Sequence, residues 1–273
     1  MSAVLDKISS LLRENNVYAF SSIGLKDCRI TKKYLLDRAG ISADEGVAVM
    51  MAVPYMAEDS VIGNISEYAK SKDYHLFFSE LFDKVLSPLR AEFTQYKFEG
   101  FSDHSPIDER DAAARAGLGI IGSNGLLITK KYSSFIFLGE LITNAPIGYI
   151  LHDAERCEAC GLCLSACPVG CDKTHCLSAV TQKKGELTEQ ERDMIRRHGS
   201  AWGCDICQKV CPHTLRAISE GTVYTNIDFF LNDRIPYLTK EKLEQLSDEA
   251  FSKRAYSWRG KEILLRNLDI LDT

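Results

Sequence analysis

The cysteines constrain the fold of this chain more than any other feature, because seven of the ten lie in two short phrases. The first has the spacing Cys-x-x-Cys-x-x-Cys-x-x-x-Cys-Pro and runs from Cys157 to Pro168. The second has the spacing Cys-x-x-Cys-x-x-x-Cys-Pro and runs from Cys204 to Pro212. The first spacing is the bacterial run that binds iron–sulfur clusters, in which the fourth cysteine binds the other of two clusters. The second phrase lacks a leading thiol, for which Cys176 is the nearest candidate upstream.

With Cys176 the chain has eight candidate ligands, the number that two [4Fe–4S] cubanes require. In the interleaved arrangement of two-cluster ferredoxins, one cluster would be held by Cys157, Cys160, Cys163 and Cys211. The other would be held by Cys167, Cys176, Cys204 and Cys207. We therefore predict a module that folds around two iron–sulfur clusters.

Two other uses of these thiols compete with this interpretation. A pair of four-cysteine zinc sites would use the same thiolates, but zinc ribbons rarely add the Cys-Pro ending. A disulfide framework is disfavoured in a chain of this size without a secretory signal. Two cysteines are left over: we interpret Cys28 as an ordinary thiol and Cys171 as a neighbour in a cluster loop.

Length and composition indicate a globular protein of one large domain, or of a core domain with a smaller module. The 273 residues are 45% hydrophobic, which is ordinary for a globular chain. We find no apolar stretch of the length that a membrane span needs, and the N-terminus carries charge where a signal peptide would be apolar. We expect no membrane association and, for so many thiolates, a reducing cytoplasm. The net charge of −5 argues against indiscriminate binding of nucleic acid.

The order of apolar and polar residues predicts an α+β chain in three parts. Residues 1–150 form an α+β domain, residues 151–220 the two-cluster module, and residues 221–273 a helical tail. Within the first part, the apolar run from Val47 to Val53 predicts a buried strand. The apolar spacing from Ile65 to about Phe93 predicts a helix.

A second informative segment lies between Phe101 and Ile128. Ser105, followed by Pro106 and by Asp108, predicts the start of a helix with Ser105 as its N-cap, and Gly117 predicts its end. Asp103 would then lie in the loop that enters this helix, a common place for a catalytic residue.

The glycines of this segment also spell a dinucleotide-binding fingerprint, Gly117-x-Gly119-x-x-Gly122. We reject nicotinamide cofactor binding, because a helix precedes the glycines where the fingerprint needs a strand. They indicate either a tight turn between helix and strand or a backbone that a ligand approaches closely.

Together these residues resemble the epoxyqueuosine reductase family. The family phrase Asp-Ser-x-Pro-x-x-Glu-Arg, followed by the glycine-rich phrase, is similar to residues 103–128, and Phe-Leu-Gly-Glu-x-x-Thr is similar to Phe137–Thr143. The cysteine run, the Cys-x-Ser-x-x-Thr phrase at Cys176 and the phrase from Gly203 to Pro212 match as well. Tyr74 and His75 belong to a further short match.

The resemblance implies a cytoplasmic reductase that uses cobalamin and two [4Fe–4S] clusters in the last step of making queuosine in tRNA. It implies a corrinoid-binding-type α/β sandwich followed by a bacterial-ferredoxin-like module, with electrons from a flavodoxin or ferredoxin. Asp103 would be the proton donor. The candidates for the cofactor pocket are Tyr74, His75, Gly117, Gly119, Gly122 and Asn124.

The chain also departs from the family pattern. His104 replaces a serine, and Ser123 replaces the usual lysine of the glycine-rich loop. The tail ends about where larger members continue into helical repeats, so we expect a short member without them. Three functions stay open: reduction of epoxyqueuosine in tRNA, corrinoid-dependent reduction of a small molecule, and electron transfer without a corrin.

Overall fold

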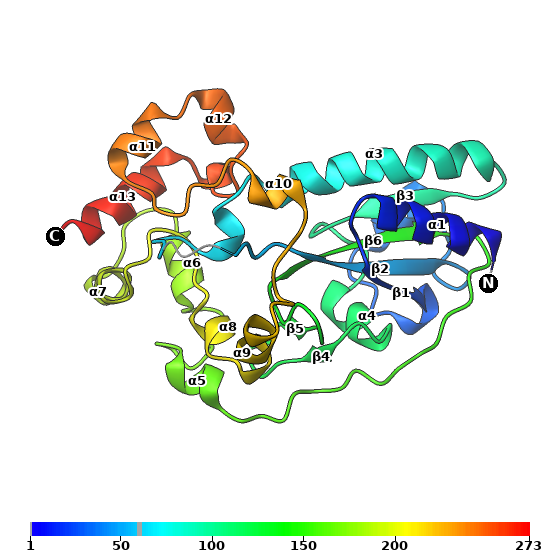
Figure 1. Cartoon of the computed structure of the whole chain (residues 1–273), viewed down its shortest axis with the longest axis horizontal. Helices are drawn as coiled ribbons and strands as arrows, with labels where there is room; N and C mark the ends of the chain where they lie inside the picture. Colours follow the sequence, from blue (N-terminus) through cyan, green and yellow to red (C-terminus); the bar gives the residue numbers. More distant parts are fainter. Residues whose placement is uncertain (1, 59–61) are drawn as a thin grey trace. The chain divides into compact units, whose positions relative to one another are not determined.

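The computed structural model describes residues 2–58 and 62–273, which form two compact units (Figure 1). The first unit consists of the chain up to Pro54 together with His75–Ala159. The second consists of Tyr55–Tyr74 and Cys160–Thr273. The mixture of helices and strands that we predicted is confirmed. None of the helices in the described ranges has the length and apolar composition needed to cross a lipid bilayer.

A four-stranded antiparallel sheet forms the centre of the first unit, in the order β1-β2-β6-β3. The strands are β1 (Ala19–Gly24), β2 (Val47–Pro54), β3 (Phe98–Phe101) and β6 (Ile136–Thr143). Every residue of β2 is buried, which confirms the strand predicted from its continuous apolar run. A small hairpin of β4 (Ile120–Ile121) and β5 (Leu127–Ile128) completes the strands.

Helices lie on both faces of this sheet (Figure 1). They are α1 (Ala3–Glu14), α2 (Lys33–Ala39), α3 (Tyr74–Glu92, which belongs to this unit from His75 onward) and α4 (Glu109–Arg115). On the face of α3, Gly139 allows close contact: a Cβ atom there would lie 2.3 Å from Phe78 Cε1. On the opposite face, Ala112 and Ala113 of α4 pack against Met50 and Ile142 in one apolar cluster. The first unit is therefore an α/β sandwich with the sheet between helices.

The helix predicted from residue 65 begins only at Tyr74, so the prediction was wrong for its first turns. The preceding residues form a short 3-10 turn, Glu67–Ala69, and their backbone bonds lead elsewhere in the second unit. The Ser66 N–H donates to the Trp202 carbonyl at 2.7 Å, and the Glu67 N–H donates to Asp205 Oδ2 at 2.8 Å. Tertiary bonds thus satisfy the groups that a helix would have used.

The second unit is built from short helices around two apolar clusters. The helices are α5 (Leu162–Ala166), α6 (Leu177–Thr181), α7 (Glu189–His198), α8 (Ile206–Lys209), α9 (Pro212–Ser219), α10 (Asp228–Leu231), α11 (Lys240–Gln245), α12 (Asp248–Ser252) and α13 (Lys261–Leu271). Trp202 and Tyr256 are central to one cluster, and Leu177 and Ile195 to the other. Helix α13 contributes to both, and its buried Asn267 donates to the Thr181 and Ala201 carbonyls. The tail is therefore joined to the cysteine-bearing segment by packing and by hydrogen bonds.

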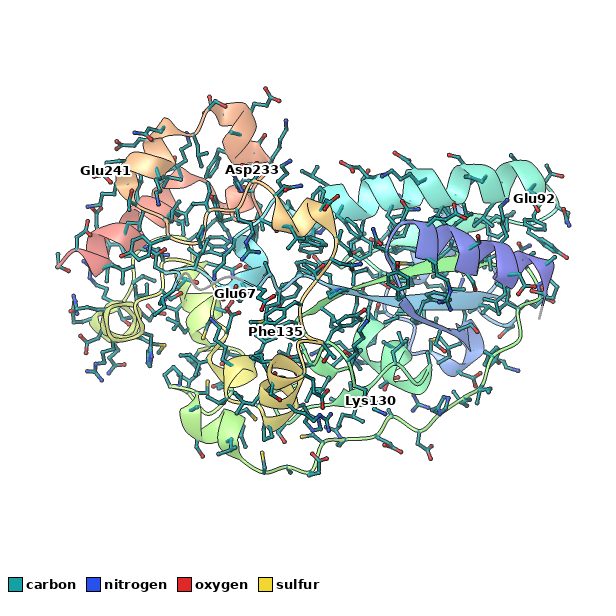
Figure 2. All side chains as sticks on the ribbon, viewed as in Figure 1. Glu67, Glu92, Lys130, Phe135, Asp233 and Glu241 are labelled. Carbon is teal, nitrogen blue, oxygen red and sulfur yellow. The ribbon has the colours of Figure 1, made fainter. Side chains whose placement is uncertain are left out.

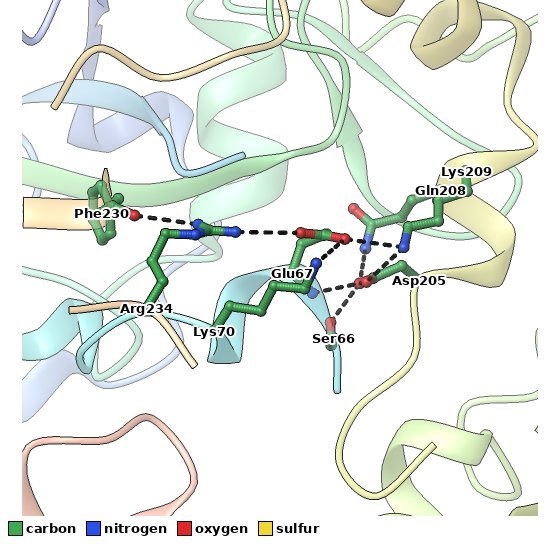
Figure 3. A network of polar contacts seen from close by, with 8 residues as sticks. All are labelled: Ser66, Glu67, Lys70, Asp205, Gln208, Lys209, Phe230 and Arg234. Atoms are coloured by element: carbon green, nitrogen blue, oxygen red, sulfur yellow. Dashed lines mark hydrogen bonds and ion pairs between the residues drawn. The ribbon is translucent and has the colours of Figure 1, made fainter. Parts of the chain in front are cut away.

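A buried polar network joins the 66–70 turn to the loop after Cys204 (Figure 3). Its centre is Glu67, which accepts from Lys70 Nζ at 2.8 Å and from Lys209 Nζ at 3.0 Å. Lys70 is only 2% exposed. Figure 2 shows Glu67 inside this unit, whereas Glu241 lies at its edge. Because a buried charge needs a partner, Glu67 stabilises the whole turn.

Replacing Glu67 with alanine should lower the free energy of unfolding by about 3–5 kcal/mol, because the cations lose the carboxylate that they share. Urea denaturation followed by tryptophan fluorescence would measure the loss. The matched control is Glu249→Ala, which removes an exposed carboxylate paired with Lys253 at 2.6 Å in the same unit. The role assigned to Glu67 is wrong if both variants unfold at the same urea concentration as the parent chain.

Candidate active site and cluster ligands

Asp103 lies in the loop that follows β3, in the left-handed backbone region with φ of +63°. Its side chain is 70% exposed, and its Oδ2 lies 3.7 Å from His75 Nε2 at the start of α3. The imidazole of His75 is the main reason why the pKa of Asp103 is lowered, and the ammonium group of Lys32 acts in the same direction. The structure thus brings together two of the predicted site residues, His75 at the start of α3 and Asp103 in the loop after β3.

His104 occupies a defined position beside this loop. Lys32 Nζ lies 3.1 Å from His104 Nδ1, and the Tyr34 hydroxyl lies 2.8 Å from His104 Nε2. An ammonium group can only donate, so Nδ1 accepts the lysine proton, and the neutral ring donates its Nε2–H to Tyr34. The histidine that departs from the family pattern therefore connects α2 to the Asp103 loop.

The predicted N-cap at Ser105 is wrong. Helix α4 begins after Asp108, whose side chain accepts from the Asp111 N–H at 3.3 Å. The residues before it are held by the 29–32 segment, since the Thr31 N–H donates to the Pro106 carbonyl at 2.8 Å. The Ser105 hydroxyl accepts from the Ile107 N–H and donates to Glu140. Gly117, with φ of +80°, follows the helix end as predicted.

Two acidic residues behind Asp103 were not selected from the sequence. The Asp103 N–H donates to Glu109 Oε1 at 3.0 Å, and the carboxyl of Glu109 contacts that of Glu140. Burial raises the pKa of Glu109 to about 7 and raises the pKa of Glu140 well above its usual range. Both residues lie in sequence phrases that match the family. For Glu140 the sequence offered one further signal, a carboxyl residue at a position of a predicted strand that faces the core.

The glycines and Asn124 have contacts within the chain that account for them. A Cβ atom at Gly119 would lie 2.3 Å from the Ile128 carbonyl oxygen, and one at Gly122 would lie 2.5 Å from Asn124 Oδ1. Asn124 Oδ1 also accepts from the Leu126 N–H at 3.2 Å. The turn before β4 therefore requires glycine at position 119, and the turn between β4 and β5 requires it at position 122. The cofactor contacts of these residues and of Tyr74 stay a prediction.

Cys157 lies near the end of the first unit, where Ser123 contacts it. The backbone N–H of Ser123 donates to Cys157 Sγ at 3.3 Å, and its hydroxyl lies 3.4 Å from the same sulfur. These bonds lower the pKa of Cys157, and the Ser123 hydroxyl has the largest effect. They therefore favour the thiolate that iron requires. Ser123, which we noted only as a departure from the family, is thus a partner of a predicted ligand.

The other predicted ligands belong to the second unit. Helix α5, which carries Cys163, contacts α8, which carries Cys207. Burial raises the pKa of Cys204 to about 12, and the neighbouring thiols of Cys176 and Cys207 add to this effect. Three of the four thiols predicted for one cluster, those of Cys176, Cys204 and Cys207, are therefore neighbours.

Cys171 lies among these thiols as well. Its Sγ–H donates to the Cys163 carbonyl at 3.4 Å, and its neighbours include the thiols of Cys167 and Cys207. Within the described ranges, no group of three or more His, Cys, Asp or Glu side chains is placed to hold one metal ion. In a cubane each thiolate binds a different iron atom, so its ligands surround a cluster and do not meet at one point.

Comparison with known proteins identifies the family. The model of a 4Fe-4S binding domain matches residues 150–173, which contain the first four cysteines of the run. Epoxyqueuosine reductase from Bacillus subtilis is 30% identical over 263 residues, covering 88% of this chain and 64% of that protein. The chain belongs to the epoxyqueuosine reductase family.

Solved structures of the family agree with this assignment. The structure of epoxyqueuosine reductase from Streptococcus thermophilus has a TM-score of 0.74 and 26% identity, covering 99% of this chain and 81% of that one. A crystal structure of the reductase with a tRNA-Tyr epoxyqueuosine-modified stem loop has a TM-score of 0.76 and 23% identity, covering 98% and 81%. The chain spans 64% and 62% of the first two curated relatives, less than two thirds of their length.

Proposed function

We propose that this chain is an iron–sulfur reductase that converts the epoxide of epoxyqueuosine in tRNA into an alkene. The observation that carries the proposal is the similarity to the Bacillus subtilis reductase over 88% of the chain. An alignment of that extent necessarily includes both the Asp103 loop and the cysteine segment. The crystal structure of a family member with a modified tRNA stem loop supports tRNA as the substrate.

The chemistry needs electrons and an acid. Converting an epoxide to an alkene consumes two electrons and two protons, breaks both carbon–oxygen bonds and releases the oxygen as water. Asp103 would donate a proton to the leaving oxygen, because its carboxyl is exposed at the tip of a loop and has an imidazole beside it. His75 would orient the carboxyl and supply a second ionisable group at the same place.

The electrons would come one at a time through two [4Fe–4S] clusters. We assign one cluster to Cys157, Cys160, Cys163 and Cys211, and the other to Cys167, Cys176, Cys204 and Cys207. The hydrogen bonds from Ser123 to Cys157 support the first set, and the proximity of Cys176, Cys204 and Cys207 supports the second. A flavodoxin or ferredoxin of the cytoplasm would reduce the clusters.

We further propose cobalamin as the group that acts on the carbon. Bound cobalamin would supply a strongly nucleophilic metal centre. The residues around Asp103 are compatible with such a group, since the side chains of Asp103 and His75 are 70% and 50% exposed and the chain itself does not cover them. The chain's own part would be to hold the acid in place and to provide its proton.

Reconstitution tests this proposal. The purified chain would be loaded with iron, sulfide and cobalamin, reduced, and incubated with tRNA that contains epoxyqueuosine. We expect mass spectrometry of the digested tRNA to show queuosine, the product with one oxygen fewer. Omitting cobalamin should stop the reaction and leave the cluster absorption unchanged. Reduction of the free nucleoside but not of the tRNA would overturn the assignment of the substrate.

A further inference from the structure

Glu140 is a carboxyl group in the apolar interior of the first unit. It lies in the middle of β6, where it pairs with Met50 of β2 on one side and with Phe101 of β3 on the other. The alternation of the strand places it on the same face as Leu138 and Ile142, which pack in the apolar cluster beneath α4. It is 0% exposed. An isolated carboxylate in such a place is strongly unfavourable, so the neutral acid is expected.

The hydrogen bonds of Glu140 indicate where its proton lies. The Ser105 hydroxyl donates to Oε1. Among the described residues no donor reaches Oε2, although that atom is buried. The carboxyl of Glu109 interacts with the Glu140 side chain, and it has no proton to donate when it is ionised. A proton on Oε2 that is donated to Glu109 would give this buried oxygen a hydrogen-bond partner.

Glu109 connects this acid to the candidate active site. Its Oε1 accepts the backbone N–H of Asp103 at 3.0 Å, so the carboxyl of Glu109 lies between Glu140 and the Asp103 loop. The other charged or titratable groups that face the two carboxyls are Lys32 and the thiol of Cys28. The residues paired with Glu140 on the neighbouring strands, Met50 and Phe101, carry no charge.

We propose that Glu109 and Glu140 form a carboxylic acid–carboxylate pair that shares one proton and positions Asp103 through its backbone N–H. The role in catalysis depends on the proposed function, but the pair itself does not. The ionised Glu109 makes a charge-assisted bond to the Asp103 N–H, which is stronger than a bond to a neutral acceptor. This bond holds Asp103 in its left-handed conformation, in which the carboxyl points to solvent.

The pair also sets a pH dependence. The pKa of Glu109 is raised to about 7. As the pH falls through that value, Glu109 is protonated and the pair then holds two protons instead of one. The neutral acid accepts less strongly from the Asp103 N–H. The Asp103 loop should therefore be held tightly above about pH 7 and should loosen below it. This pH dependence is opposite to that of the Asp103 carboxyl itself, whose protonated form is favoured by low pH.

Infrared spectroscopy tests the shared proton. At about pH 8 exposed carboxyls are ionised, and the parent chain should still show the carbonyl band of a neutral carboxylic acid. Glu140→Gln should abolish this band without unfolding the chain, since an amide can donate to Glu109 and accept from Ser105. Glu99→Gln, an exposed carboxyl of β3 paired with Arg90, is the matched control and should keep the band. A band that is absent from the parent or insensitive to Glu140→Gln would overturn the pair.

Nuclear magnetic resonance and kinetics test the positioning. The amide signal of Asp103 should titrate near pH 7 in the parent and in Glu140→Gln, but not in Glu109→Gln. Turnover in Glu109→Gln should fall by about 100-fold with little change in KM, because a misplaced acid costs rate more than binding. An Asp103 amide that ignores pH, or turnover in Glu109→Gln within twofold of the parent, would refute the positioning role. The infrared and amide results decide the pair even if the parent does not reduce epoxyqueuosine.

Discussion

Asp103→Asn should lose turnover by about 10²- to 10⁴-fold, the range that a general acid contributes. Asparagine keeps the size of the side chain and is tolerated in the left-handed backbone region that Asp103 occupies. It also keeps the backbone N–H that donates to Glu109. The substitution therefore removes the proton and leaves the loop in place.

The lowered pKa of Asp103 adds a condition to this prediction. With His75 beside it, the exposed carboxyl is ionised at neutral pH in the free protein. A bound substrate or cofactor that excludes water would raise its pKa and allow it to donate. We therefore expect turnover to fall as the pH rises above the pKa that Asp103 has in the substrate complex.

The measurement for this variant is single-turnover reduction of epoxyqueuosine tRNA, with iron content and cobalamin spectra recorded on the same sample. Asp37→Asn is the matched control, because it is an exposed aspartate of the first unit that pairs with Lys33. The control should retain the parent rate. Turnover of Asp103→Asn close to that of the control would show that another group protonates the leaving oxygen.

The sequence predicts best where one physical pattern determines the outcome. The run from Val47 to Val53 is apolar throughout, and it forms a strand buried on both faces. The helix expected from Ile65 fails because its first residues bond to Trp202 and Asp205, more than 130 positions away along the chain. Such long-range partners leave no trace in local periodicity.

The site shows the same division. Asp103 was selected from its loop position and from the family phrase, and the structure places it beside His75. The roles of Ser105 and Glu109 could not be predicted, because each depends on Glu140 from a distant strand. Three ordinary polar residues become one connected group only when β6 and α4 pack together. Local sequence predicts which residues can do chemistry, and the tertiary fold decides which of them act together.

Cys176→Ala should reduce the iron content from about eight atoms per chain to about four, because a cubane that loses one of its four thiolates is not retained. Cys176 is the ligand that the second phrase lacks, and its thiol is a neighbour of Cys204. Losing this cluster should also stop turnover, because one of the two redox centres that carry electrons to the active site would be missing.

Cys171→Ala is the matched control for this variant, because the thiol of Cys171 lies among the same cysteines and is not assigned to a cluster. Iron and sulfide analysis of both reconstituted proteins, together with electron paramagnetic resonance of the reduced state, would compare them. We expect Cys171→Ala to keep both cluster signals. Loss of iron from Cys171→Ala but not from Cys176→Ala would exchange the two assignments, and zinc in place of iron would remove the basis for electron transfer. Burial and neighbouring thiols do not distinguish Cys176 from Cys171, because both lie beside other cysteines. The iron content of the two variants distinguishes them, because only the loss of a ligand removes a cluster.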